Sequence, residues 1–392
     1  MTHRENAEVI VVCAGWSGLP AAKLPSEAGI KTIVLEKRAK DSTKNCSSEI
    51  VCQESFENAF GSGSLLNEKN GKISAPIERF LSEYRTYQIQ KDSFTSINFR
   101  NQNSNNFIVL RRSFNQWMSE AVENKGAFIA YQEVARELII KDRKIYGVKT
   151  DNNEYFANVV IVAEGINSTL TKKTGLRIGE FTPNQVFLFL EENISLPSEL
   201  IEERFNLEKD QGIAAQLLTN SFFDTPSIGY LYTNKESITI GTGVLLSSSI
   251  EKETNINKYL EKIKNHPAIK PLLHCGIINN FNSYILPTNK GDLNGILLPK
   301  LFTNGCLIVG GAALLANPYS FDPSALVILS GKFAADTIIK AKNLNDYSEK
   351  TLSHYGKAIK QHLNQEKRNY GNSIPNDQKI INNLRSLISQ GK

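Results

Sequence analysis

Residues 8–36 read EVIVVCAGWSGLPAAKLPSEAGIKTIVLE, two short apolar runs separated by a glycine-bearing turn. The runs 8–13 and 31–36 are rich in β-branched residues, which is typical of buried parallel strands. Residues 21–28 between them have the composition of a helix. Together they predict a βαβ unit, and therefore an α/β fold built on a parallel sheet.

The turn between the runs carries most of a dinucleotide fingerprint. That fingerprint is G-x-G-x-x-G after a strand, with an acid about 20 residues later. Here residues 13–18 read CAGWSG and the acid is Glu36, so Gly15 and Gly18 match the second and third glycines. Cys13 replaces the first, and Pro25 removes a helical donor at a cost of about 3 kcal/mol. The segment is either a nucleotide site or a βαβ unit whose loop has drifted.

The rest of the chain indicates a Rossmann-type domain, split in sequence, with an inserted, mainly antiparallel β substrate domain. Residues 179–284 alternate and are rich in aromatic and β-branched side chains, with a predicted hairpin of 229–233 and 237–243. Strands are also predicted at about 137–141, 144–150, 158–162 and 305–309. Helices are predicted at about 113–124, 255–265, 323–342 and 347–366. The predicted ranges are 1–75, 108–178 and 291–342 for the dinucleotide domain, 76–107 and 179–290 for the substrate domain, and 343–392 for a C-terminal helical region.

Composition excludes several classes of protein. The formal charge of +5 is spread along the chain without a basic block, which argues against nucleic-acid binding. Five cysteines without a C-x-x-C pair predict neither a disulfide framework nor a metal site. The polar N-terminus lacks a signal core and no apolar run is long enough to span a bilayer, so we expect a cytoplasmic protein. An apolar stripe in the tail, containing Ile380, Leu384 and Leu387, packs on protein or rests peripherally on a membrane.

Several segments in one order resemble the FixC and geranylgeranyl reductase family of FAD-dependent oxidoreductases. They cover nearly the whole chain up to about residue 340. The segments are residues 8–36, 109–117 (VLRRSFNQW), 160–168 (VIVAEGINS), 196–205, 230–234 (YLYTN), 266–268 and 310–332.

The resemblance implies positions for FAD contacts. Glu36 matches the acid that binds the adenosine ribose, and Arg111 matches a basic residue beside the cofactor. Glu164-Gly165 stands where the family has Asp-Gly, and Gly310 matches the first residue of G-D-A-A-G. Together with Gly15 and Gly18, these are the predicted cofactor-binding residues.

The same comparison shows departures that cluster at the cofactor. Gly311 replaces the Asp of G-D-A-A-G and Leu314 its last glycine, while Phe321 and Pro323 replace the glycines of a following G-x-G turn. With Cys13, these departures place FAD binding in question. A loop that lies by the flavin ring reads Cys46-Ser47-Ser48-Glu49 instead of a glycine-rich sequence.

Two functions follow. The first is an FAD-dependent oxidoreductase that passes electrons between flavin and a quinone-like carrier or an unsaturated lipid-like substrate. The resemblance implies an electron-transfer flavoprotein or ferredoxin-like partner, and since the flavin carries the chemistry, no catalytic residue is named. The alternative is a flavin-free homologue that serves as a binding or scaffold subunit.

Overall fold

The parallel sheet predicted from residues 8–36 is present in a computed structural model of the chain. The described residues are 3–40, 42, 47–66, 71–101, 104–177, 181–225, 227–287, 299–316 and 324–372. The sheet has six strands in the order β18-β19-β12-β2-β3-β8, and all neighbouring pairs are parallel except β18 with β19. Its strands are β2 (Val9–Val12), β3 (Thr32–Glu36), β8 (Phe128–Tyr131), β12 (Val159–Val162), β18 (Phe302–Thr303) and β19 (Cys306–Ile308). Every residue of β2, β3 and β12 is buried, as expected for a sheet covered on both faces.

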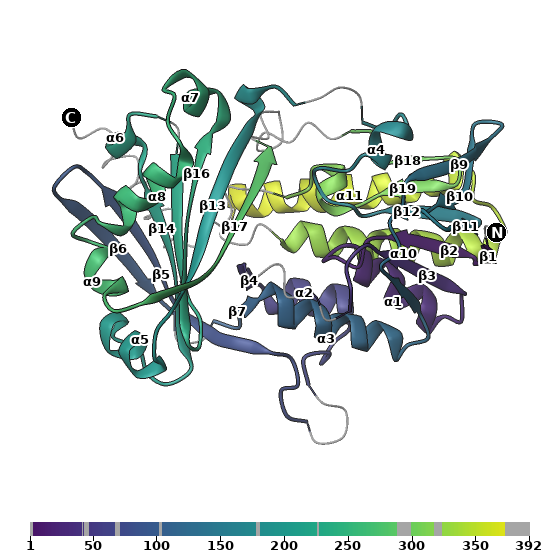
Figure 1. Cartoon of the computed structure of the whole chain (residues 1–392). Coiled ribbons are helices and arrows are strands. Elements are labelled where there is room, and N and C mark those ends of the chain that lie inside the picture. Colours follow the sequence, from purple (N-terminus) through teal and green to yellow (C-terminus); the bar gives the residue numbers. More distant parts are fainter. Residues whose placement is uncertain are drawn as a thin grey trace.

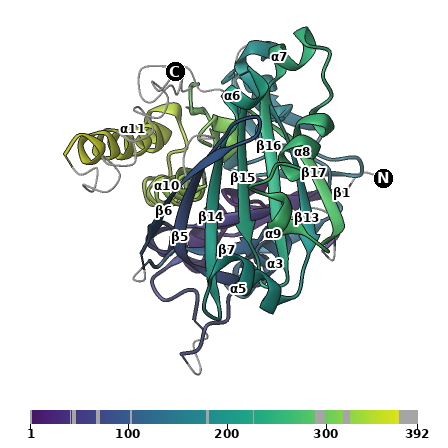
Figure 2. The same ribbon diagram turned by 90° about the vertical axis from the view of Figure 1, so that its left-hand side faces the viewer.

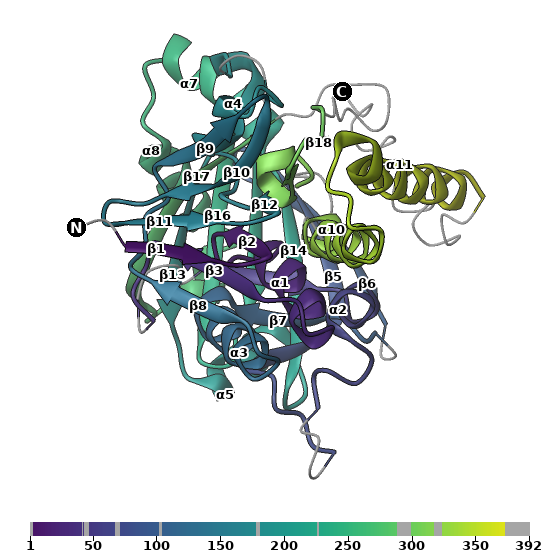
Figure 3. The same cartoon turned by 90° about the vertical axis from the view of Figure 1, so that its right-hand side faces the viewer.

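Helices pack on this sheet and join distant parts of the chain. They are α1 (Gly18–Glu27), α2 (Gln53–Phe60), α3 (Arg111–Glu123), α4 (Leu170–Lys173), the short η2 (Gly310–Ala313), α10 (Ala325–Leu344) and α11 (Glu349–Asn372). The last two are the helices predicted at 323–342 and 347–366. In Figure 3, α10 lies beside α1 and α2, and α11 packs on α10. The helix α1 runs through Pro25, which lies in its last turn, where only one backbone bond is lost.

A nine-stranded sheet forms the second lobe (Figures 1 and 2). Its order is β17-β13-β16-β15-β14-β5-β7-β4, with β6 paired to β5, and all neighbours except β14 and β5 are antiparallel. The strands are β4 (Ser48–Val51), β5 (Ile77–Ile89), β6 (Phe94–Arg100), β7 (Phe107–Leu110), β13 (Val186–Ser195), β14 (Gln211–Leu218), β15 (Ser227–Thr233), β16 (Ser237–Leu245) and β17 (Ile277–Pro287). The predicted hairpin is therefore confirmed as β15 and β16.

Short helices also belong to the lobe of the nine-stranded sheet. They are η1 (Pro183–Gln185), α5 (Ser198–Phe205), α6 (Asn220–Phe223), α7 (Leu246–Glu251), α8 (Ile256–Lys264) and α9 (Lys270–Leu273). Figure 1 shows α5, α8 and α9 on the face of the sheet that points away from the six-stranded sheet. The other face is thus left to line the space between the lobes.

The strands differ from the sequence prediction in two places. β4 and β7 pair with each other in the nine-stranded sheet, although the predicted ranges 1–75 and 108–178 assign most of their residues to the dinucleotide domain. Short apolar runs show that a strand is buried but not which sheet it joins. A four-stranded sheet of order β1-β11-β10-β9 also forms, from β1 (His3–Asn6), β9 (Glu137–Lys141), β10 (Lys144–Lys149) and β11 (Asn153–Phe156). Neither β1 nor β11 was expected, because both are polar and β1 is fully exposed.

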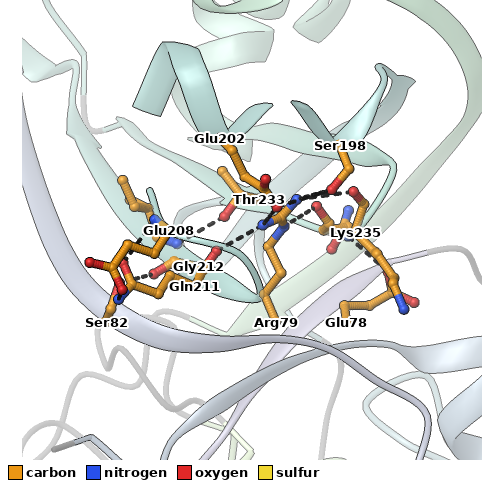
Figure 4. A network of polar contacts seen from close by, with 12 residues as sticks. Glu78, Arg79, Ser82, Ser198, Glu202, Glu208, Gln211, Gly212, Thr233 and Lys235 are labelled. Atoms are coloured by element: carbon orange, nitrogen blue, oxygen red, sulfur yellow. Dashed lines mark hydrogen bonds and ion pairs between the residues drawn. The ribbon is translucent and has the colours of Figure 1, made fainter. Parts of the chain in front are cut away.

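One buried arginine links three neighbouring segments of the nine-stranded lobe through hydrogen bonds (Figure 4). The guanidinium of Arg79, on β5, donates to the carbonyl oxygens of Asn234, Lys235 and Gln211 at 2.7, 3.1 and 3.0 Å. It also donates to Glu202 Oε1 at 3.0 Å and Ser198 Oγ at 2.7 Å, both on α5. The side chain is 1% exposed. Arg79 therefore joins α5, the start of β14 and the β15–β16 turn through its hydrogen bonds.

No helix in the described part of the chain is long and apolar enough to cross a membrane. The predicted apolar stripe at Ile380, Leu384 and Leu387 lies outside the described residues.

Candidate functional site

A cavity of about 820 Å³ separates the two lobes. One wall is the edge of the six-stranded sheet where its parallel strands end, with Gly15 after β2, Arg38 after β3 and Gly165 after β12. The opposite wall is the inner face of the nine-stranded sheet, including Phe189 and Tyr230. Ligands of open α/β sheets bind outside the carboxyl ends of the strands, and their pockets measure about 300–1,000 Å³. Position and size therefore suit a ligand as large as a dinucleotide.

The glycine turn lies on this cavity with its two glycines in different roles. A side chain on Gly18 would place its Cβ 2.0 Å from the carbonyl oxygen of Cys13, so close packing of α1 against the turn requires this glycine. A Cβ on Gly15 would meet only Cys13 Sγ, at 3.7 Å, and Gly15 lines the cavity. The fold does not need Gly15, but a ligand that approaches the backbone does.

Cys13 keeps the backbone conformation of the glycine it replaces. Its φ is +87°, in the region that favours glycine. Burial, with the Glu36 carboxylate as the next cause, raises the pKa of the Cys13 thiol to about 12. The thiol is therefore protonated at neutral pH, which disfavours a nucleophilic role.

Glu36 is buried at the end of β3 and reaches back to the glycine turn. Its Oε2 accepts from the backbone N–H of Ala14 at 2.8 Å, and its Oε1 accepts from that of Arg38 at 3.0 Å. Arg38 Nε lies 3.3 Å from Oε1. Each carboxylate oxygen can accept more than one hydrogen bond, so Glu36 keeps acceptor capacity. Glu36 does not line the large cavity; it lines a smaller pocket together with Arg38, which lines both.

Three polar side chains at the cavity contain buried atoms with no hydrogen bond within the described part of the chain. They are Trp16 Nε1, Arg111 Nε and Asn115 Oδ1. The guanidinium of Arg111 lies over the Trp16 ring, 5.0 Å from its centroid, and its Nε is 3.4 Å from Glu49 Oε2, beyond a good hydrogen bond. Trp16 itself packs into the core, 5.6 Å from the Phe114 ring, and does not fill the cavity. All three atoms are inaccessible to solvent, so they do not themselves face the cavity, and what Arg111 contributes there is its positive charge.

The predicted residues after β12 and β19 meet at the same edge. Glu164 Oε2 accepts from Ser168 Oγ at 2.6 Å and from the N–H of Leu170 at 3.1 Å, so this carboxylate organises its own loop. Gly165 and Gly310 have φ of +79° and +60°. A Cβ on Gly310 would lie 2.3 Å from Ser17 Oγ, which explains why this glycine is retained.

The residues that depart from the family pattern line this same part of the cavity. A Cβ on Gly311 would lie 3.2 Å from Gly165 Cα, and Leu314 has φ of +59° although it is not glycine. Leu314 and Gly311 both line the cavity and leave it open. The departures predicted at Cys46, Phe321 and Pro323 lie outside the described residues.

The opposite wall holds a buried polar cluster that the sequence analysis did not identify. Glu191 of β13 is 3% exposed; its Oε2 accepts from Tyr230 OH at 2.6 Å, and Tyr230 OH lies 2.9 Å from Tyr284 OH. Its Oε1 accepts from Ser47 Oγ and from Asn282 Nδ2, the latter at 3.2 Å. All five residues line the cavity. The available signal was an acid in phase with Phe187 and Phe189, directly after the apolar run VFLFL at residues 186–190.

The residues present fit the adenosine diphosphate half of FAD. Gly15 is open to the cavity, Glu36 keeps acceptor capacity, and the cations Lys37, Arg38 and Arg111 line the same space. The half that would hold the ring has space, but Gly311 supplies no carboxylate there.

Comparisons with known proteins agree with this geometry. A family model described as glucose inhibited division protein A matches residues 8–200. Protein FixC of Azorhizobium caulinodans is 31% identical over 361 residues, covering 90% of this chain and 80% of that protein. Protein FixC of Escherichia coli K12 is 28% identical over 363 residues, covering 91% of this chain and 81% of that protein.

Two solved structures share the fold. A geranylgeranyl bacteriochlorophyll reductase-like protein from Thermoplasma acidophilum has a TM-score of 0.74 at 20% identity, with coverage of 92% of this chain and 84% of that one. The myxobacterial chondrochloren halogenase, described as a variant of FAD-dependent halogenases, has a TM-score of 0.67 at 15% identity, with coverage of 93% and 81%.

The fold is that of the two-lobed flavoproteins, with a Rossmann-type domain and a mainly antiparallel β domain. Within that fold, the chain belongs to the FixC family of FAD-dependent oxidoreductases. The family prediction and the fold class are therefore confirmed.

Proposed function

We propose that the protein binds FAD in the cavity between its lobes and passes electrons between the flavin and a quinone-like carrier or an unsaturated lipid-like substrate. The observation that carries the proposal is the open cavity of about 820 Å³, which reaches from Arg38 and Val134 at the end of the six-stranded sheet to Phe189 and Tyr284.

The two walls of the cavity have different roles in this proposal: one holds FAD and the other contacts the substrate. Gly15, Glu36 and Arg111 hold the adenosine diphosphate half, with Glu164, Gly165 and Gly310 beside the rest. The bound flavin supplies the redox chemistry. The rings of Phe189 and Tyr284 stack at 5.1 Å between centroids and 4° between planes, and Tyr230 and Tyr232 stack at 5.2 Å. These rings suit a flat, apolar substrate.

The electron donor is proposed from the family. Membership of the FixC family implies an electron-transfer flavoprotein or a ferredoxin-like protein as partner. Such a partner would be a separate protein that delivers electrons to the flavin. A quinone substrate would draw the protein to a membrane surface.

The visible spectrum of the purified protein tests the proposal. We expect a yellow protein that releases FAD on denaturation and whose reduced flavin is reoxidised by a soluble quinone. A colourless preparation that takes up no added FAD would favour the alternative, a flavin-free binding or scaffold subunit. That alternative is motivated by the cluster of replaced cofactor residues, which are Cys13, Gly311, Leu314, Phe321 and Pro323.

A further inference from the structure

The polar cluster at the substrate wall forms one continuous chain of hydrogen bonds. Glu191 is its buried end, Tyr230 its middle and Tyr284 its end at the cavity. Tyr230 OH uses its donor and acceptor sites on these two neighbours. Among the described residues, Tyr284 OH forms a hydrogen bond only with Tyr230 OH, so Tyr284 has a further hydrogen-bonding position for a ligand.

The direction of this chain depends on the charge of Glu191. When Glu191 is ionised, Tyr230 donates to it and Tyr284 donates to Tyr230, so Tyr284 offers the cavity only a lone pair. When Glu191 is protonated, it donates to Tyr230, Tyr230 donates to Tyr284, and the Tyr284 O–H is free. One proton thus decides whether the cavity wall is a donor or an acceptor.

We propose that Glu191, Tyr230 and Tyr284 form a proton relay that donates a hydrogen bond, and then one proton, to a carbonyl oxygen of a flat ligand in the cavity. When reduction by the flavin makes that oxygen anionic, Tyr284 gives it a proton and takes one from Tyr230, which takes one from Glu191. The net change is one new O–H on the ligand and one carboxylate on Glu191. The relay deepens the proposed function by naming the ligand group that the site recognises.

The surroundings of Glu191 support a proton-holding role. Burial, the largest effect, raises the pKa of Glu191 despite the hydrogen bonds from Ser47, Tyr230 and Asn282. The charged and titratable groups around the cluster are Glu49 on β4, Arg111 on α3, Tyr230 and Tyr232 on β15, and Tyr284 on β17. Burial also raises the pKa of both Tyr230 and Tyr284 well above the ordinary value, so both hydroxyls stay neutral while Glu191 titrates.

Glu191→Gln is a sharp test because its amide has one favourable orientation. Ser47 and Asn282 both donate to Oε1, so the amide oxygen stays there and the amide N–H faces Tyr230. That arrangement fixes the relay in its donating direction at every pH. Tyr284→Phe removes the donor but keeps the ring that stacks on Phe189. Tyr259→Phe, which removes a buried tyrosine hydroxyl from α8, away from the residues that line the cavity, is the control.

The probe is duroquinone, whose fully methylated ring resists addition of thiols. Its binding is measured by equilibrium dialysis between about pH 5 and about pH 9, because buried glutamates titrate in this range. The wild-type affinity should fall about fivefold as pH rises, as expected for loss of one hydrogen bond. Glu191→Gln should bind tightly throughout, Tyr284→Phe weakly throughout, and Tyr259→Phe like the wild type. A Glu191→Gln protein that keeps the wild-type pH dependence, or a Tyr284→Phe protein that binds as tightly as the wild type at low pH, would overturn the relay.

Duroquinone binding can be measured by dialysis whether or not the purified protein contains flavin. A colourless protein with this binding pattern would refute the proposed function and leave only the hydrogen-bond donation by Tyr284, because the proton transfer requires reduction by the flavin. A yellow protein without this pattern would refute the relay and leave the proposed function.

Discussion

At the scale of single residues, two of the described non-glycine residues that line the cavity have backbone conformations that favour glycine. Cys13 has φ of +87° and Leu314 has φ of +59°, and both line the cavity. Such conformations cost a residue with a Cβ about 1–2 kcal/mol. The backbone of both turns has therefore been kept although the glycines have been replaced, which explains why the cavity remains open.

Replacing Cys13 by glycine should relieve this strain. We expect Cys13→Gly to raise the free energy of unfolding by up to about 1 kcal/mol, since the gain is partly offset by greater freedom of the unfolded chain. Cys13→Ala removes the thiol and keeps the strain, so it should give no gain. Denaturant unfolding of both variants separates the two effects, and equal stability of the pair would argue against strain at this position.

Substitution of the two glycines of the turn should have different effects, one on stability and the other on FAD affinity. Gly18→Ala places a methyl group 2.0 Å from the Cys13 carbonyl oxygen and should cost roughly 3 kcal/mol of stability. Gly15→Ala meets only Cys13 Sγ at 3.7 Å, so stability should change by less than about 0.5 kcal/mol. Its FAD affinity should nevertheless fall at least about tenfold. Thermal unfolding and FAD titration of each variant measure this, and a Gly15→Ala protein with intact affinity would remove Gly15 from the site.

Restoring aspartate at Gly311 tests the lost flavin contact. The new Cβ would lie 3.2 Å from Gly165 Cα and Ile166 N, so this loop must shift by a few tenths of an ångström. We expect Gly311→Asp to tighten FAD binding about tenfold or more, because hydrogen bonds to a charged group are strong. Gly311→Asn, which has the same size and no charge, is the control. Equal affinities for the two variants would show that the carboxylate has no ligand to hold.

At the scale of elements, Arg79 controls how α5 and the β15–β16 turn attach to the sheet. Arg79→Met leaves three carbonyl oxygens and the Glu202 carboxylate without their buried partner, and should cost about 3–5 kcal/mol. Arg79→Lys keeps the charge but not the geometry and should fall in between. Hydrogen exchange should rise first in α5 and the turn, while β2 and β12 stay protected. Uniform loss of protection across both lobes would contradict this local role.

Elements with a strong periodic pattern could be predicted, and those set by distant pairing could not. The strands β2, β3, β12 and β19 and the hairpin β15–β16 follow from apolar runs and turn residues. The exposed, polar β1 exists because it pairs with β11, about 150 residues away in sequence. β4 and β7 were placed in the wrong lobe for the same reason, since sequence reports burial and not the partner strand.

At the scale of the whole molecule, the site is assembled from both lobes. The dinucleotide wall was predictable because its glycines and Glu36 lie in one short motif. The substrate wall was not, because Ser47, Glu191, Tyr230 and Tyr284 come from four strands or loops that only the folded sheet brings together. Pairing of β13 with β16 and β17, and of β15 with β16, sets the register that brings Glu191, Tyr230 and Tyr284 to one point.

The central claim is that the cavity between the lobes still binds FAD, and a titration of the flavin-stripped wild-type protein with FAD tests it most directly. We predict saturable uptake that is weakened at least about tenfold in Gly15→Ala while thermal unfolding of that variant is unchanged. A folded wild-type protein that takes up no FAD at any concentration tested would contradict the account.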